Sequence, residues 1–67
     1  MVNIVVNGEP QTVCAGESLL GLLQRLELDP ARVAVELDRR IVKAPHWKET
    51  VLRAGARVEI VQFVGGG

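Results

Sequence analysis

The sequence predicts an α+β domain in which one helix packs across a single mixed sheet of four to five strands. Alternating residues at both ends of the chain indicate strands, and a leucine-rich segment with helical spacing lies between them. The chain has 67 residues, which is enough for one domain with a small core. A helix and several strands in so short a chain must share that core, so we expect two layers.

The first two strands form a predicted hairpin. Residues 2–6 alternate in side-chain character with a period of two, and Asn7-Gly8 follows at once. Asn-Gly is a strong hairpin signal because both turn positions require positive φ. The second strand is expected from Glu9 to Cys14, with Pro10 near its start, where a missing N–H does little harm.

The helix is predicted to begin at Ser18, whose hydroxyl can cap the first turn. Gly21 removes a side chain and so would let the helix lie close to the sheet. Asp29-Pro30 is the expected end of the segment, since the residue before proline avoids the α region. The apolar stripe consists of Leu19, Leu20, Leu22, Leu23 and Leu26.

Strands are predicted again in the second half of the chain. The third strand covers residues 33–37, Asp38 to Arg40 form a turn, and Ile41-Val42 return from it. The last strand is expected to run from Arg57 to Val64, with Ala54-Gly55 as the turn before it. The stretch between residues 43 and 56 has no periodicity, and its expected anchors in the core are Pro45, Trp47 and Leu52.

A parallel pairing of the first and last strands, joined through the helix, would make this a ubiquitin-like β-grasp fold. The domain would then comprise residues 1–64. Residues 65–67 would form a flexible glycine tail.

Composition and charge exclude several classes of function. Eight basic and eight acidic residues give no net charge, which argues against nucleic acid as a partner. The apolar runs are too short for a membrane span, and no leader pattern opens the chain, so we expect a cytoplasmic protein. With Cys14 and His46 as the single residues of their types, neither an internal disulfide nor a Cys/His zinc site can form, and no metal site is predicted.

Three glycines close the chain directly after the last predicted strand. A thread of Gly65, Gly66 and Gly67 reaches about 10 Å and can enter a cleft that side chains would block. The α-carboxylate at its end is ionised at neutral pH. It can attack the α-phosphate of ATP, and a sulfur nucleophile can convert the resulting acyl-adenylate to a thiocarboxylate. A frayed terminus is the alternative interpretation.

The sequence resembles the ThiS family, the sulfur carriers of thiamine thiazole biosynthesis, over essentially its whole length. The matching segments are Ile4-Val5-Val6-Asn7-Gly8-Glu9, Ser18-Leu19-Leu20-Gly21-Leu22-Leu23, Val33-Ala34-Val35-Glu36, Ile41-Val42, Trp47 and the ending from Val58 to Gly67. Their order, in a chain this short that ends in glycine, makes the resemblance specific. Two positions depart from it: Asp38, where asparagine is common, and Ala56, where a Gly-Asp turn is common.

The resemblance implies a β-grasp fold and a carrier that is not itself an enzyme. A ThiF-type adenylating enzyme would activate the Gly67 carboxylate with ATP and magnesium, and the carrier itself would bind no cofactor. A cysteine desulfurase would supply sulfur as a persulfide. Thiazole synthase would then consume the thiocarboxylate.

Other residues have competing interpretations. Phe63 and Val64 are expected either in the core or as apolar anchors for a partner enzyme. Arg39 and Arg40 are expected in a solvated turn, with partner contact as the alternative. Cys14 is expected to be a small buried hydrophobe rather than a redox or persulfide relay, and His46 a surface or turn residue.

Three other functions stay open on the sequence. A carrier like the small subunit of molybdopterin synthase also ends in a glycine pair. A ubiquitin-like modifier would instead be joined to target lysines. A β-grasp binding module would keep its glycine tail inert.

Overall fold

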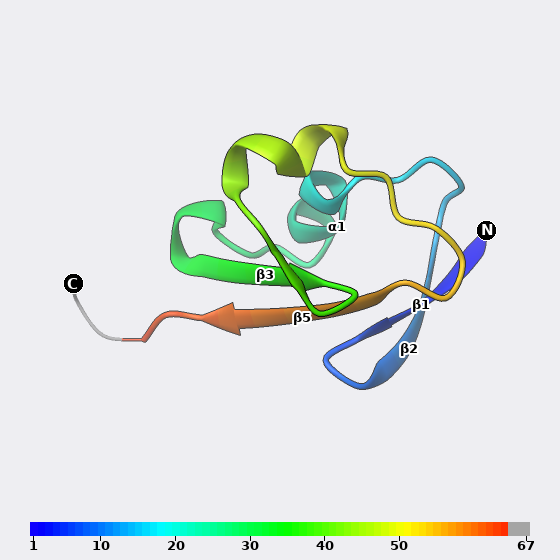
Figure 1. Ribbon diagram of the computed structural model, residues 1–67, viewed down its shortest axis with the longest axis horizontal. Helices are drawn as coiled ribbons and strands as arrows, with labels where there is room; N and C mark the ends of the chain where they lie inside the picture. Colours follow the sequence, from blue (N-terminus) through cyan, green and yellow to red (C-terminus); the bar gives the residue numbers. More distant parts are fainter. Residues whose placement is uncertain (65–67) are drawn as a thin grey trace.

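The computed structural model describes residues 1–64, and these form a five-stranded mixed sheet with one α-helix across one face (Figure 1). The strand order is β2-β1-β5-β3-β4. Two 3-10 helices, η1 and η2, are the remaining elements of the described residues. The elements are β1 (Val2–Val6), β2 (Glu9–Val13), α1 (Leu19–Arg25), η1 (Pro30–Arg32), β3 (Val33–Leu37), β4 (Arg40–Val42), η2 (Ala44–Glu49) and β5 (Arg57–Gln62).

The first and last strands lie side by side at the centre of the sheet. They run parallel, with Val5 opposite Arg57 and Val6 opposite Val58, while every other pairing is antiparallel. A right-handed crossover through a helix is the usual connection between parallel neighbours. The predicted ubiquitin-like β-grasp arrangement is therefore confirmed.

Both hairpin turns use left-handed backbone conformations. Asn7 and Gly8 have φ of 50° and 81°, as the Asn-Gly signal predicts. Asp38 and Arg39 form the second turn without a glycine, with φ of 50° and 71°. The Asp38 carboxylate accepts a hydrogen bond of 2.9 Å from the Arg57 N–H of the neighbouring strand, which helps to hold this turn in place.

Helix α1 begins where the sequence predicts but ends earlier. The Ser18 hydroxyl accepts from the Gly21 N–H at 3.0 Å, which confirms the N-cap. The expected end at Asp29-Pro30 is wrong, because Glu27 turns the chain first with φ of 59°. The Glu27 and Leu28 N–H groups bond back to the carbonyls of Gln24 and Leu23, a Schellman motif formed without glycine.

Gly21 does not serve to bring the helix close to the sheet. A Cβ atom there would lie 2.7 Å from a carboxylate oxygen of Glu17, so the missing side chain makes room for that residue. The Glu17 carboxylate pairs with the Arg25 guanidinium at 3.0 Å, and Arg25 lies one helical turn after Gly21. This ion pair ties the loop before α1 to the last turn of the helix.

The segment between β4 and β5 is more regular than the sequence indicates. It contains η2, which starts at Ala44 and has Pro45 in its first turn, where proline fits well. Pro45 is exposed, so its expected role as a core anchor is wrong. Trp47 and Leu52 are buried as predicted, and the indole N–H of Trp47 donates to the Val42 carbonyl at 2.6 Å.

The core lies between α1 and one face of the sheet. It is filled by apolar side chains from every strand except β4, together with α1, η2 and the segment after η2. Its members are Ile4, Val6, Val13, Leu19, Leu22, Leu23, Val33, Val35, Trp47, Leu52, Ala56 and Val58. The other face of the sheet has no helix over it (Figure 1). Part of the candidate site lies on this helix-free face.

Candidate functional site at the end of the last strand

Strand β5 changes its surroundings along its length. Val58 is fully buried, whereas Val61 is 61% exposed, Phe63 56% and Val64 95%. The strand ends at Gln62 rather than at the predicted Val64, because Gln62 lies opposite Val33, the first residue of β3. One further hydrogen bond of 2.7 Å, from the Phe63 N–H to the Arg32 carbonyl, holds the chain beyond the strand.

The predicted reactive group lies outside the described residues. Gly65, Gly66 and Gly67 follow Val64 directly in the sequence. Their assignment as tail, and of the Gly67 carboxylate as the reactive group, stays a prediction. The structure does describe the end of β5 from which these residues continue.

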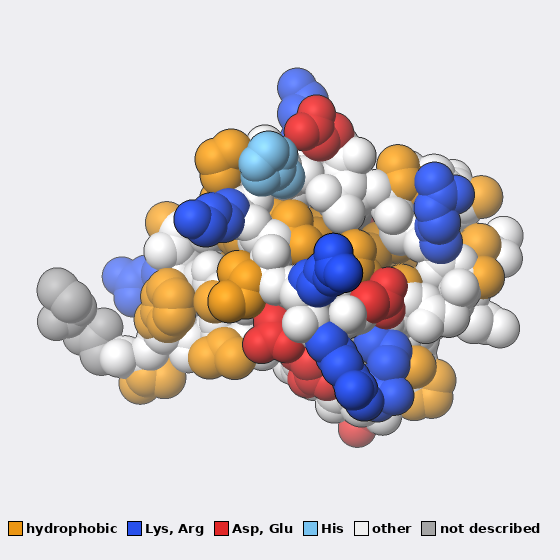
Figure 2. Space-filling model, viewed as in Figure 1, with side chains coloured by type: hydrophobic (Ala, Val, Ile, Leu, Met, Phe, Trp, Pro, Cys, Tyr) orange, Lys and Arg blue, Asp and Glu red, His pale blue; other side chains and the backbone are white. Residues whose placement is uncertain are grey.

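An apolar patch covers the helix-free face of the sheet beside the end of β5. Ala34 and Val61 lie directly opposite each other, and both point away from the core because their neighbours Val33 and Ile60 point into it. Ile41 shares this outer face through its pairing with Glu36. We call Ala34, Ile41, Val61 and Phe63 the open-face patch. Figure 2 shows hydrophobic side chains gathered on the side of the molecule that leads to the C-terminal segment.

The exposure of Phe63 and Val64 excludes a place in the core, and their contact with a partner stays a prediction. Neither belongs to the core, so both are available as surface anchors for a partner. An exposed aromatic residue at the edge of an apolar patch is typical of interaction sites. The sequence singles out these two residues but not Ala34, Ile41 or Val61, whose place in the patch depends on strand register.

Arg39 and Arg40 lie at the other end of the sheet. Arg40 pairs with Leu37, and Leu37 pairs with Val58, four residues before Gln62. Four residues of a strand span about 13 Å. The two arginines are exposed as expected, but the structure does not bring them together with Phe63 and Val64. Contact with a partner at this turn stays a prediction.

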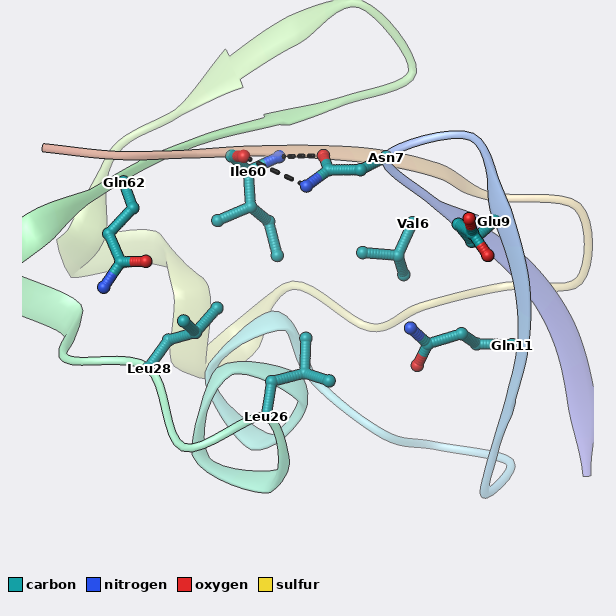
Figure 3. Close-up of a pocket in the computed structure, with 8 residues that line it drawn as sticks. All are labelled: Val6, Asn7, Glu9, Gln11, Leu26, Leu28, Ile60 and Gln62. Atoms are coloured by element: carbon teal, nitrogen blue, oxygen red, sulfur yellow. Dashed lines mark hydrogen bonds between the residues drawn. The ribbon is translucent and has the colours of Figure 1, made fainter.

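A hollow lies on the helix side of the sheet, beside the same end of β5 (Figure 3). Its volume is about 430 Å³. Leu26, Leu28 and Ile60 point toward one another across it, and polar side chains stand around them. Its lining consists of Val6, Asn7, Glu9, Gln11, Leu26, Leu28, Ile60 and Gln62.

Asn7 joins the hairpin turn to β5 above this hollow. Its side-chain amide donates to the Ile60 carbonyl at 3.2 Å, and its amide oxygen accepts from the Ile60 N–H at 2.7 Å (Figure 3). The Asn7 side chain therefore makes the two hydrogen bonds to Ile60 that the backbone of a longer β1 would make. Pattern reasoning assigns Asn7 only to the turn, because this contact spans 53 residues of sequence.

The expectation for Cys14 is wrong, whereas that for His46 is confirmed. Cys14 is exposed, since Val13 before it points into the core and successive side chains point to opposite faces. The Arg25 guanidinium lies 3.9 Å from the Cys14 sulfur. This basic neighbour is eleven residues away in the sequence, so the sequence alone does not indicate it. His46 is exposed on η2, with its Nδ1 3.3 Å from a carboxylate oxygen of Glu49.

Two further properties concern residues 1–64. No helix in this range is long and apolar enough to cross a membrane. Within the same range, no three or more histidine, cysteine, aspartate or glutamate side chains are grouped so that they could hold a metal ion.

Comparison with protein families places the chain by sequence. The model of the ThiS family matches residues 2–67. Over 66 residues the chain is 39% identical to a thiazole synthase from Magnetococcus marinus, a match that covers 98% of this chain but 20% of that protein. It is 24% identical to the sulfur carrier protein ThiS of Escherichia coli, covering 98% of this chain and all of that one.

Comparison with solved structures agrees with the sequence match. The crystal structure of a thiamine biosynthesis protein (ThiS) from Geobacter metallireducens superposes with a TM-score of 0.84 at 32% identity. The match covers 98% of this chain and 100% of that one. The fold is therefore shared with a structure of that description.

Proposed function

This chain belongs to the ThiS family of sulfur carriers for thiamine biosynthesis, and we propose that it carries sulfur as a thiocarboxylate on Gly67. Members of the family are carriers and not enzymes. The observation that supports the proposal is the course of β5, which runs from a buried start to an exposed end directly before three glycines.

The chemistry follows from a carboxylate at the end of the chain. One of its oxygens attacks the α-phosphate of ATP, and pyrophosphate leaves, which gives an acyl-adenylate. Magnesium would be held by the adenylating enzyme with the ATP phosphates, as is usual for this ion. The outer sulfur of a persulfide then attacks the acyl carbon and displaces AMP. A thiol finally reduces the S–S bond, and the thiocarboxylate is released with the matching disulfide.

The sequence of the tail suits this chemistry. Glycines have no Cβ, so residues 65–67 present a thread that a narrow active site can enclose. Phe63 and the open-face patch supply apolar surface at the base of the thread, where an enzyme groove can bind. Binding energy from this surface can then position the distant carboxylate.

The proposed partners are a ThiF-type adenylating enzyme, a cysteine desulfurase and a thiazole synthase. For the last, support comes from the Magnetococcus marinus thiazole synthase, which includes a segment similar to this whole chain. Two functions joined in one chain act on each other efficiently, because linkage raises their effective concentration. We further propose that the reactions take place in the cytoplasm, where ATP is present and thiols stay reduced.

Genetic complementation tests the proposal and separates it from the other carriers. The gene should restore growth without thiamine to a strain that lacks its own thiazole sulfur carrier. It should not rescue a strain that lacks the molybdopterin synthase small subunit. A matched variant with one bulky residue added after Gly67 should fail in the thiamine strain. Rescue of the molybdenum-cofactor strain alone, or rescue by the extended variant, would overturn the proposal.

A further inference from the structure

The parallel pairing of β1 with β5 stops before β5 does. The Asn7 N–H bonds to the Val58 carbonyl at 2.8 Å, and the Asn7 side chain then takes both backbone groups of Ile60. After Asn7 the chain turns into β2, which pairs on the far side of β1. From Gln62 onward, the β1 side of β5 is therefore without a neighbouring strand.

The backbone of Gln62 faces this open side. Antiparallel ladders alternate, so that one residue bonds to its neighbour strand and the next points away. Phe63 bonds to Arg32 on the β3 side, which places the N–H and carbonyl of Gln62 on the opposite side. Within residues 1–64, neither group has a hydrogen-bond partner. The last residue of the strand thus offers one donor and one acceptor to an added strand.

The hollow in Figure 3 lies against the helix-side face of this open edge. Ile60 and Gln62 reach into it from β5, and Leu26 and Leu28 form its apolar floor. Side chains along a strand alternate between faces, so a segment paired with Gln62 would direct alternate side chains into this space. A hollow of about 430 Å³ is large enough for an apolar side chain.

The rim of the hollow has a negative charge without a counterion. Glu9 stands on it and forms no ion pair within the described part of the chain. No lysine or arginine lines the hollow. Glu27, between the two floor leucines, is likewise exposed and outside the ion pairs of residues 1–64. A complementary segment would carry a cation beside its apolar residue.

We infer that an extended segment of the adenylating enzyme adds to the sheet as a short strand at Gln62. It bonds to the N–H and carbonyl of Gln62, inserts one apolar side chain over Leu26 and Leu28, and places a lysine or arginine near Glu9. The inference rests on the proposed function, since it names how the tail-binding enzyme holds this chain. Such strand addition fixes the direction of the backbone just before the glycines.

A proline at the open edge tests the hydrogen bond. Gln62→Pro removes an N–H that the fold itself does not use, and proline is tolerated at the edge of a sheet. Gln62→Ala removes the same side chain but keeps the N–H, so it is the matched control. We expect the proline variant to bind the adenylating enzyme at least about tenfold more weakly than the alanine variant. Equal affinities for the two folded variants would overturn the inference.

Amide exchange on the wild-type chain tests the same contact without a substitution. In the free protein the Gln62 amide should exchange rapidly, whereas the Phe63 amide is protected by its bond to Arg32. Addition of the adenylating enzyme should slow exchange at Gln62. Exchange at Gln62 that stays rapid in the saturated complex would contradict strand addition, even if the proline variant fails to fold.

Charge reversal tests the chemistry of the partner segment. Glu9→Lys should lower the association rate several-fold and reduce its dependence on salt. The control is Glu49→Lys on η2, outside the hollow, which should leave both unchanged. Equal effects of Glu9→Lys and Glu49→Lys on the association rate would contradict a lysine or arginine of the partner near Glu9.

These outcomes are distinct from failure of the proposed function. If the wild-type chain binds the enzyme but forms no adenylate, the proposed function fails while the edge contact can still be measured. If adenylate forms and the proline and alanine variants bind alike, the proposed function stands and the edge contact fails.

Discussion

The two halves of β5 differ in what lies beside them in the sheet. The first half lies between β1 and β3, and Val58 there is fully buried. The second half pairs with β3 alone, and of its residues on the same side as Val58, Ile60 is only partly buried and Gln62 is exposed. The difference arises because β1 turns away at Asn7, so the neighbouring strand ends while β5 continues.

The two halves of β5 therefore have different roles, the first in the stability of the domain and the second in contact with partners. The first half fixes the strand in the core, and changes there should unfold the domain. The second half presents apolar surface and free backbone groups, and changes there should affect partners. A rigid start and an accessible end are what a carrier needs to present a terminal group at a defined place.

The largest effect is expected from the end of the chain. Deletion of Gly67 should abolish adenylation, because the carboxylate would then lie one residue too near the domain to reach the ATP. The thermal midpoint of unfolding should stay unchanged, since no core contact is removed. Pyrophosphate release in the presence of the adenylating enzyme measures adenylation, and circular dichroism measures the thermal midpoint. Parallel loss of folding would mean that the tail is structural.

The same substitution in each half of β5 should have different effects on stability. Val58→Ala should lower the free energy of unfolding by about 2 kcal/mol, because it empties two methyl positions in the core. Val61→Ala, on the open-face patch, should lower it by less than about 0.5 kcal/mol. Urea denaturation measures both values. Similar losses would contradict the assignment of Val58 to the core and of Val61 to the exposed face of the sheet.

Phe63 should matter for binding and not for folding. Phe63→Ala should weaken binding to the adenylating enzyme about tenfold, as expected for an aromatic anchor. Its free energy of unfolding should change little, because the ring is half exposed. His46→Ala, an exposed change on η2, is the matched control for binding by calorimetry. Unaltered affinity of the Phe63 variant would remove this residue from the interface.

A smaller effect than that of Phe63→Ala is expected at the junction between the halves. Asn7→Gly keeps the left-handed turn but loses both hydrogen bonds to Ile60, at a cost of about 1 kcal/mol. Asn7→Asp keeps the acceptor for the Ile60 N–H and should lose less. Urea denaturation measures the free energy of unfolding of the two variants and of the wild type. Equal stability of the glycine variant and wild type would mean that the amide contributes nothing at this junction.

Local signals predict much of this fold correctly. Asn7-Gly8 marks the hairpin, Ser18 caps the helix, and alternation in residues 33–37 marks a strand, because each depends on neighbours in sequence. The end of α1 is not predictable in the same way. Glu27 takes a conformation that favours glycine, and backbone bonds to Gln24 and Leu23 stabilise it.

The surfaces around the site depend on contacts between distant residues. Phe63 and Val64 stand out because they precede the glycines. Ile41 and Val61 reach one face only through the register of β3 with both of its neighbours. The exposure of Cys14 likewise follows from the register of β2, in which Val13 points into the core and the next side chain therefore does not.

The intact mass of the carrier after reaction tests the central claim most directly. The full chain ending at Gly67 is incubated with the adenylating enzyme, ATP, magnesium and a persulfide donor. We predict a gain equal to the replacement of one oxygen by sulfur, located by fragmentation at Gly67. An unchanged mass, with an enzyme that is active on its own carrier, would contradict the account.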